Sequence, residues 1–226
     1  MAFKMIVFDW DGTLLDSTGA ITHAIRQACQ DAALPDPGQE IASFVIGLGL
    51  AEALRYAAPS ATDEQLNILT ESYRHNYLKA DHTLRLFAGA VPLLEALQQR
   101  NITCTVATGK SRQGLNRAME QTKTRPFFAG TRCADECHSK PHPEMLHELM
   151  EEFSFVPEEV LMIGDTTHDL QMAQAAGTHA LAVCSGAHPR NMLVQLPHLA
   201  AFTSVSEATP WLLQALDSGV LSTRTP

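Results

Sequence analysis

The alternation of short apolar runs with helical stretches after residue 88 constrains the fold more than any other feature of this sequence. Apolar or β-branched runs occupy 102–107, 160–163 and 180–183, with a weaker run at 127–130. Stretches of helical character separate them at 91–99, 113–121, 144–153 and 170–176. Strands that alternate with helices form a mostly parallel sheet with helices on both faces. The sequence therefore predicts an α/β fold with a doubly wound, mostly parallel, Rossmann-like sheet.

The N-terminal part of the chain adds one strand and a long helical insertion. A short apolar run at 4–8 ends in Asp9, which predicts a buried strand that leads into a tight turn. Residues 17–81 show only helical patterns, and Thr62 with Gln65 forms a capping box. Because one crossover needs far less helix, we expect residues 17–81 to form a separate helical domain, and residues 1–16 and 82–226 to form the α/β core. Residues 218–226 are predicted to form a loose tail.

The charge balance excludes several classes of partner. Sixteen lysines and arginines against 25 acidic residues give 16 − 25 = −9, so no basic field is available to hold a nucleic acid or an anionic membrane. No apolar run approaches the ~18 residues of a membrane helix. Asp9 and Asp11 directly follow the first apolar run, which is unlike a signal peptide. We expect a cytoplasmic monomer or weak homodimer that binds neither nucleic acid nor membrane.

The cysteines favour free thiols over a disulfide framework or a zinc site. Five cysteines are an odd number in a chain expected to be cytoplasmic. Cys133, Cys137 and His138 resemble half of a zinc site. A structural zinc site usually needs a second close pair of ligands, and the sequence has no such pair of cysteines.

Polar residues gather where the predicted strands end. Asp9 and Asp11 follow the first strand, residues 108–110 follow the second, residues 164–169 follow the fourth, and Lys140 stands in a connecting loop. Parallel strands end at one edge of the sheet, so these groups should converge there. Clustered carboxylates repel one another unless a cation lies among them, and hard oxygen ligands suit Mg²⁺. A metal, an ammonium group, a hydroxyl and exposed backbone amides together indicate a phosphoryl-transfer site.

The same residues resemble a known family over essentially the whole chain. The segments 9–17 (DWDGTLLDS), 108–109 (TG), Lys140 and 164–169 (GDTTHD) are similar, in order and spacing, to the four motifs of the haloacid dehalogenase-like hydrolase superfamily. The helical insertion after the first motif resembles the subgroup with a helical cap, which includes the bacterial phosphoglycolate phosphatases. The resemblance implies a magnesium-dependent phosphatase whose partner is a small phosphate ester.

The resemblance also implies roles for the acidic residues. The first aspartate of the family is the nucleophile and the second is the general acid and base, which here are Asp9 and Asp11. The acids of the fourth motif bind or orient magnesium, a role that falls to Asp165 and to Asp169, either as a direct ligand or by orienting the site. Asp9 and the backbone carbonyl of Asp11 are expected to face the same metal.

The remaining motif residues are expected to bind the phosphoryl group. In the family, the hydroxyl of the second motif and the lysine of the third hold this group, which implies Thr108 and Lys140. The backbone amides around Gly12 and Gly109 should offset its charge. The presence of a second aspartate in the first motif, which true dehalogenases lack, favours phosphoryl transfer.

The cap residues are expected to choose the substrate. The segment 47–50 (GLGL) and Arg55 resemble the cap segment of phosphoglycolate phosphatases, so Leu48 and Arg55 are the predicted substrate-selecting residues. The implied reaction is hydrolysis of a small, phosphoglycolate-like phosphomonoester through an aspartyl-phosphate. One alternative is a sugar-phosphate mutase of the same superfamily, which would need basic residues in the cap to bind a second phosphate. The other is a non-enzymatic signalling module that is phosphorylated on Asp9.

Five side chains near these motifs have plainer interpretations. His138 and His142 are expected on the surface, and His168 is expected to be solvated or to lie beside the site. Ser17 is interpreted as a helix cap, because no histidine base is patterned to it. Lys110 is interpreted as a surface residue, with a phosphate contact as the alternative.

Overall fold

The fold is built on one parallel sheet. The computed structural model describes residues 3–218. The sheet has six parallel strands in the order β3-β2-β1-β4-β5-β6, so the predicted doubly wound, mostly parallel fold is confirmed. The strands are β1 (Met5–Phe8), β2 (Thr103–Thr108), β3 (Gly130–Cys133), β4 (Val160–Gly164), β5 (His179–Val183) and β6 (Ala201–Phe202).

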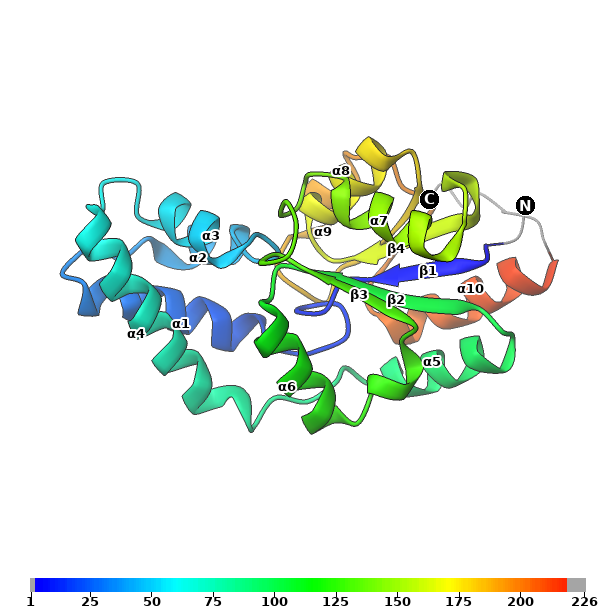
Figure 1. Ribbon diagram of the computed structural model, residues 1–226, viewed down its shortest axis with the longest axis horizontal. Helices are drawn as coiled ribbons and strands as arrows, with labels where there is room; N and C mark the ends of the chain where they lie inside the picture. Colours follow the sequence, from blue (N-terminus) through cyan, green and yellow to red (C-terminus); the bar gives the residue numbers. More distant parts are fainter. Residues whose placement is uncertain (1–2, 219–226) are drawn as a thin grey trace.

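Helices cover both faces of this sheet (Figure 1). They are α5 (Ala90–Gln99), α6 (Arg112–Thr122), α7 (Glu144–Phe153), α8 (Thr167–Ala176), α9 (Arg190–Leu193) and α10 (Val205–Ser218), with 3₁₀ turns η1 (Arg125–Phe127) and η2 (Pro157–Glu159). Successive side chains of a strand point to opposite faces. Ile6 and Phe8 of β1 therefore pack with α5, α6 and α10, whereas Met5 and Val7 pack with α7, α8 and α9. No helix within residues 3–218 is long and apolar enough to cross a membrane.

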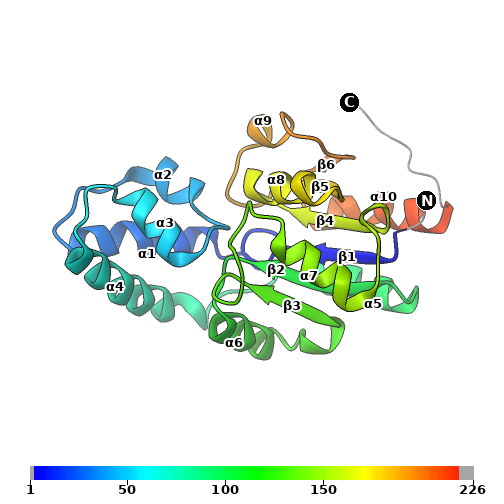
Figure 2. The same cartoon turned by 45° about the horizontal axis from the view of Figure 1, so that its top comes forward.

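The inserted helices pack around a cluster of their own. They are α1 (Thr18–Asp31), α2 (Gly38–Phe44), α3 (Leu50–Ala57) and α4 (Asp63–Asp81), and they lie beyond the carboxyl ends of the strands (Figures 1 and 2). Buried residues from α1, α3 and α4, such as Ile25, Leu54 and Leu69, form a hydrophobic cluster separate from those of the core. This separate cluster supports the division at residues 17–81, which we retain as a proposal. These four helices are called the cap below.

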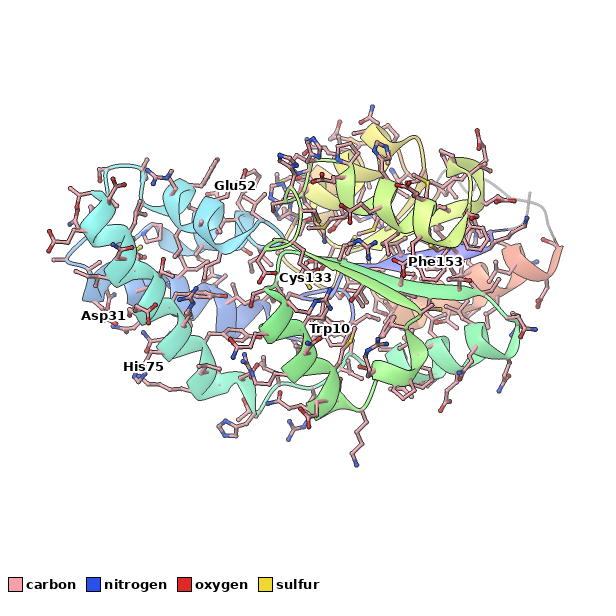
Figure 3. All side chains as sticks on the ribbon, viewed as in Figure 1. Trp10, Asp31, Glu52, His75, Cys133 and Phe153 are labelled. Atoms are coloured by element: carbon pink, nitrogen blue, oxygen red, sulfur yellow. The ribbon has the colours of Figure 1, made fainter. Side chains whose placement is uncertain are left out.

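Two polar features hold the long helices of the cap. Gln65 donates its backbone N–H to Thr62 Oγ1 at 3.2 Å, and Thr62 donates its N–H to Gln65 Oε1 at 3.1 Å, so the predicted capping box is confirmed at the start of α4. At the end of α1, the Asp31 carboxylate accepts hydrogen bonds from Ser72 and Asn76 of α4 (Figure 3). These contacts join the end of α1 to the middle of α4.

The structure corrects the limits of several predicted elements. The third strand begins at Gly130 rather than at residue 127, because residues 125–127, including Pro126, form the 3₁₀ turn η1. Helix α8 begins three residues earlier than predicted, since Thr166 caps it. The short β6 and the helices α9 and α10 were not predicted. The predicted tail falls outside the described residues except for Ser218, the last residue of α10.

Candidate active site

The carboxyl ends of three neighbouring strands bring the predicted polar residues together. β1 lies between β2 and β4, and all three strands end at the same edge, next to the cap (Figure 2). Asp9 follows β1, Thr108 ends β2, and Asp165 follows β4. Lys140 reaches the same place from the loop between β3 and α7. The predicted convergence at one edge of the sheet is therefore what the structure shows.

Lys140 lies at the centre of this cluster. Its side chain is fully buried, and its Nζ contacts Asp9 Oδ1 and, at 2.6 Å, Asp169 Oδ1. Burial alone would lower the pKa of Lys140, but the carboxylates of Asp169 and Asp9 more than offset this and raise the pKa. The lysine therefore remains protonated and joins the nucleophile predicted on β1 to the acid on α8.

The start of α8 orients Asp169. Asp169 Oδ2 accepts hydrogen bonds from the Thr166 N–H at 3.0 Å and the Thr166 hydroxyl at 2.7 Å. The Asp169 N–H donates back to Thr166 Oγ1 at 3.3 Å, which completes a buried capping box. Both carboxylate oxygens are therefore held by protein donors, one by Lys140 and one by Thr166. This arrangement supports an orienting role for Asp169.

Asp165 is held by groups for which the sequence analysis predicted no role. Its Oδ1 accepts from the Thr13 hydroxyl, and its Oδ2 accepts from the Ala187 N–H, each at 2.7 Å. Gly12 packs against it with φ of +91°, where a Cβ atom would lie 2.3 Å from Asp165 Oδ2. Thr13 belongs to the first motif, so its place in the site could have been predicted from the sequence. Ala187 lies in the loop after β5, and this position after a strand was the only sequence feature that could have indicated its role.

Three carboxylates share this buried space with one ammonium group. Ligand atoms of Asp9, Asp165 and Asp169 lie within 4.8 Å of one another. Burial raises the pKa of Asp9 to about 7, Lys140 opposes this, and Asp169 adds to it. Burial, followed by the charges of Asp9 and Asp169, raises the pKa of Asp165 well above its usual value. Among the described residues, buried Asp9 Oδ2 has no hydrogen-bond partner. This set of hard oxygen donors fits a divalent cation.

Asp11 has a different environment, which links the core to the cap. Its Oδ1 accepts from the Ser17 hydroxyl at 2.6 Å and pairs with Lys110 Nζ at 3.0 Å. Lys110 Nζ also donates to the hydroxyl of Tyr77, on α4 of the cap, at 2.9 Å. Burial alone would lower the pKa of Lys110, but Asp11, together with Tyr77 and Tyr73, more than offsets this and raises the pKa.

One prediction about these neighbours was wrong, and another holds only for the backbone. Lys110 is not a surface residue, since its side chain is only 9% exposed and lies between Asp11 and the cap. Ser17 is the N-cap residue of α1, as predicted, but its hydroxyl makes no capping hydrogen bond and instead donates to Asp11. The contacts of Lys110 and Ser17 with Asp11 depend on tertiary packing, which local sequence patterns do not show. The position of Lys110 directly after the second motif was the only hint in the sequence.

The second motif lies where the core contacts the loop between α2 and α3 of the cap. Thr108 is fully buried, and its Oγ1 accepts the Lys110 N–H at 3.2 Å. A Cβ atom on Gly109 would lie 2.5 Å from the Leu48 carbonyl oxygen and 2.6 Å from that of Gly47. Glycine is therefore required at position 109 for the cap loop to reach the strand ends.

A cavity of about 470 Å³ lies between the strand ends and the cap. Asp9, Asp11 and Thr108 line its core side, and Leu48 lines its cap side. Arg55 does not line it, contrary to its predicted role. The buried face of α3 carries Ala53, Leu54 and Ala57, so Arg55 points away, 64% exposed, with its guanidinium 3.6 Å from Asp63.

Two histidines of the core form hydrogen bonds with the same backbone carbonyl of the cap. The Nε2 atoms of His168 and His188 each donate to the Phe44 carbonyl oxygen at 2.9 Å, and the Phe44 ring stacks on His188. His168 is therefore buried rather than solvated, because the end of α2 covers it. His138 and His142 lie on the surface, as predicted.

Comparisons with known proteins identify the family of this chain and agree with its fold. A family model described as haloacid dehalogenase-like hydrolase matches residues 6–183. The phosphoglycolate phosphatase of Aliivibrio fischeri is 31% identical over 192 residues, covering 81% of this chain and 85% of that protein. Pyrophosphatase PpaX of Oceanobacillus iheyensis is 29% identical over 194 residues, covering 85% and 89%. A hydrolase from Pseudomonas syringae of known structure has a TM-score of 0.84 at 24% identity, covering 95% and 98%.

The fold and the cluster at the strand ends thus define a hydrolase with an inserted helical cap. The chain belongs to the haloacid dehalogenase-like hydrolase family. The predicted family is therefore confirmed, and the relatives named as phosphatases agree with the predicted class of phosphoric monoester hydrolase.

Proposed function

We propose that this protein is a Mg²⁺-dependent phosphatase that hydrolyses a small phosphomonoester through an aspartyl-phosphate on Asp9. The observation that carries this proposal is the state of Asp9. One of its oxygens is held by Lys140, while the other is buried without a hydrogen-bond partner among the described residues. A carboxylate that attacks phosphorus needs one oxygen that is held in position but engaged in no hydrogen bond. A metal ion needs a hard oxygen donor nearby, and Asp9 meets both requirements.

The chain's own residues account for both half-reactions. Asp9 attacks phosphorus and forms an acyl-phosphate, while Asp11 donates a proton to the departing alkoxide. Asp11 then takes a proton from the water that cleaves the acyl-phosphate, which releases inorganic phosphate and restores both aspartates. Thr108, Lys140 and the amides around Gly12 and Gly109 would bind the equatorial oxygens.

The acidic cluster would hold the metal. Asp9, Asp165 and the carbonyl of Asp11 are the proposed direct ligands. Asp169 acts by orienting Lys140, because both of its oxygens are already held. Bound magnesium would offset the negative charge of the phosphoryl group. Waters would complete its coordination, since magnesium usually keeps several in such sites.

The mutase alternative has less support. It needs cations in the cap that are available for a second phosphate. The basic residues available there instead bind groups of the cap itself: Arg26 pairs with Asp36, Arg55 with Asp63 and Arg74 with Glu71, and Lys79 donates to Asn76. The signalling alternative does not explain the cavity or the position of Asp11 beside it.

Steady-state hydrolysis of nitrophenyl phosphate tests the proposal. Activity should disappear with a chelator and return on addition of Mg²⁺. Asp165→Asn should raise the Mg²⁺ concentration needed for half-maximal activity by at least about tenfold, because a charged hard ligand is lost. Asp36→Asn, an acid of the cap surface, is the matched control and should leave that concentration unchanged. Full activity of wild-type protein in metal-free buffer would exclude the proposed metal dependence.

A further inference from the structure

The cavity is large for a two-carbon substrate. Its volume of about 470 Å³ falls in the range of about 300–1,000 Å³ that is typical of pockets for drug-sized ligands. The phosphoryl group would occupy only the end beside Asp9 and Asp11. A leaving group of two carbons would therefore leave most of the cap side of the cavity unfilled.

The cap side of this cavity is lined mainly by apolar side chains. Ile21 and Ile25 come from α1, and Ile46 and Leu48 come from the loop between α2 and α3. The stacked rings of Tyr73 and Tyr77 on α4, with centroids 6.0 Å apart, add aromatic surface. Such a wall favours an apolar leaving group, because burying apolar surface is favourable and the wall offers few polar partners.

Each cation that lines the cavity lies beside a carboxylate. Lys110 pairs with Asp11 at 3.0 Å. Arg117 pairs with Asp81 at 2.5 Å, and Arg74 pairs with Glu71 at 2.8 Å. Within residues 3–218, every lysine and arginine that lines the cavity thus has a carboxylate partner. A second anionic group on a substrate would lose its hydration there without gaining an unpaired cation, which is unfavourable.

From these observations we infer that the substrate is a monophosphate ester of a medium-sized, uncharged, largely apolar alcohol, aromatic or aliphatic, rather than of a small hydroxy acid. This inference rests on the proposed phosphatase function. It also sets the chain apart from its relative named for phosphoglycolate, whose leaving group is small and anionic. The core side of the cavity binds the phosphoryl group, and the apolar cap side selects the alcohol.

The direct test compares esters that differ only in charge or length. Phenethyl phosphate should be hydrolysed with a kcat/KM at least about tenfold above the values for its para-carboxylate analogue and for phosphoglycolate. Across ethyl, propyl and butyl phosphate, kcat/KM should rise about fourfold for each methylene that becomes buried. Preference for either carboxylate-bearing ester, with nitrophenyl phosphate still hydrolysed, would overturn the inference but leave the proposed function intact. Absence of hydrolysis of every ester would overturn both.

A variant that exposes one cation tests the charge argument separately. Asp81→Asn removes the charge that neutralises Arg117, with little change in shape. It should raise kcat/KM for the carboxylate analogue, relative to phenethyl phosphate, by about tenfold. Asp217→Asn, which removes the partner of Arg100 on the surface, is the matched control and should not change this ratio. An unchanged ratio in a folded Asp81→Asn protein would contradict the role assigned to the paired cations.

Discussion

The same helix-capping motif occurs in the cap and in the core, with different consequences. At the start of α4 in the cap, Thr62 and Gln65 exchange two hydrogen bonds in an exposed position. At the start of α8 in the core, Thr166 and Asp169 make the equivalent exchange while fully buried. The other oxygen of Asp169 contacts Lys140, which contacts Asp9. One motif therefore only begins a helix, whereas the other also orients a charged site.

The contrast extends to the two sides of the cavity. On the core side, Thr166, Asp169, Lys140 and Asp9 form a continuous chain of polar contacts. A change in one of these groups therefore alters the others. On the cap side, apolar side chains dominate and most charges are paired locally. We therefore expect substitutions in the core to alter the chemistry, and substitutions in the cap to alter substrate choice or stability alone.

The largest effect should come from the nucleophile. Asp9→Asn should reduce turnover by on the order of 10⁴-fold or more, because the covalent step is lost. The fold should persist, since asparagine has nearly the same shape and Lys140 keeps its contact with Asp169. Steady-state kinetics and thermal unfolding of the purified variant measure both. Wild-type turnover by a contaminant-free variant would exclude Asp9 as the nucleophile.

Asp11→Asn should separate the two half-reactions. An alkyl phosphate needs a proton on its leaving group, so its turnover should fall by about 10²–10⁴-fold. Nitrophenyl phosphate has a better leaving group and should still form the aspartyl-phosphate, which then accumulates because no base activates water. Rapid mixing should show a nitrophenol burst of about one equivalent per site.

The control for this experiment is the wild-type protein, which shows a burst only if dephosphorylation already limits its turnover. Equal losses on both esters without a burst would contradict the assignment. Asp11 would then act mainly through the position of its backbone in the turn after β1.

Thr166→Ala tests whether the buried capping box positions the site. The substitution removes the hydroxyl that donates to Asp169 Oδ2 at 2.7 Å. We expect the free energy of unfolding to fall by about 2 kcal/mol and kcat to fall by about tenfold. Thr166→Ser should restore both, because it retains the hydroxyl. Loss of stability with unchanged kcat would show that Thr166 caps the helix without orienting Asp169.

The smallest effect is expected for the matching position in the cap. Thr62→Ala should lower the free energy of unfolding by about 1 kcal/mol, the usual cost of losing an N-cap side chain. Because Thr62 is not among the residues that line the cavity, kcat/KM should not change for any ester. Urea unfolding and steady-state kinetics provide the comparison. A fall in kcat as large as that of Thr166→Ala would contradict the separation of roles between cap and core.

The sequence alone determined the fold class and the location of the site. Alternating strands and helices require a parallel sheet, and in such a sheet Asp9, Thr108 and Asp165 must end at one edge whatever the details of packing. Helices with clear amphipathic patterns were also found from local residues, as α7 (Glu144–Phe153) shows. These features depend on local periodicity and chain direction, which the sequence displays directly.

Only the tertiary structure decided which distant side chains meet. Lys110 and Ser17 reach Asp11, His188 reaches the cap carbonyl of Phe44, and Arg55 turns away from the cavity. None of these follows from a motif, because a local pattern fixes the face of a helix but not the element that packs against it. The pairing of each cation in the cavity likewise depends on how the cap lies over the strand ends, and this packing determines the kind of leaving group that we infer.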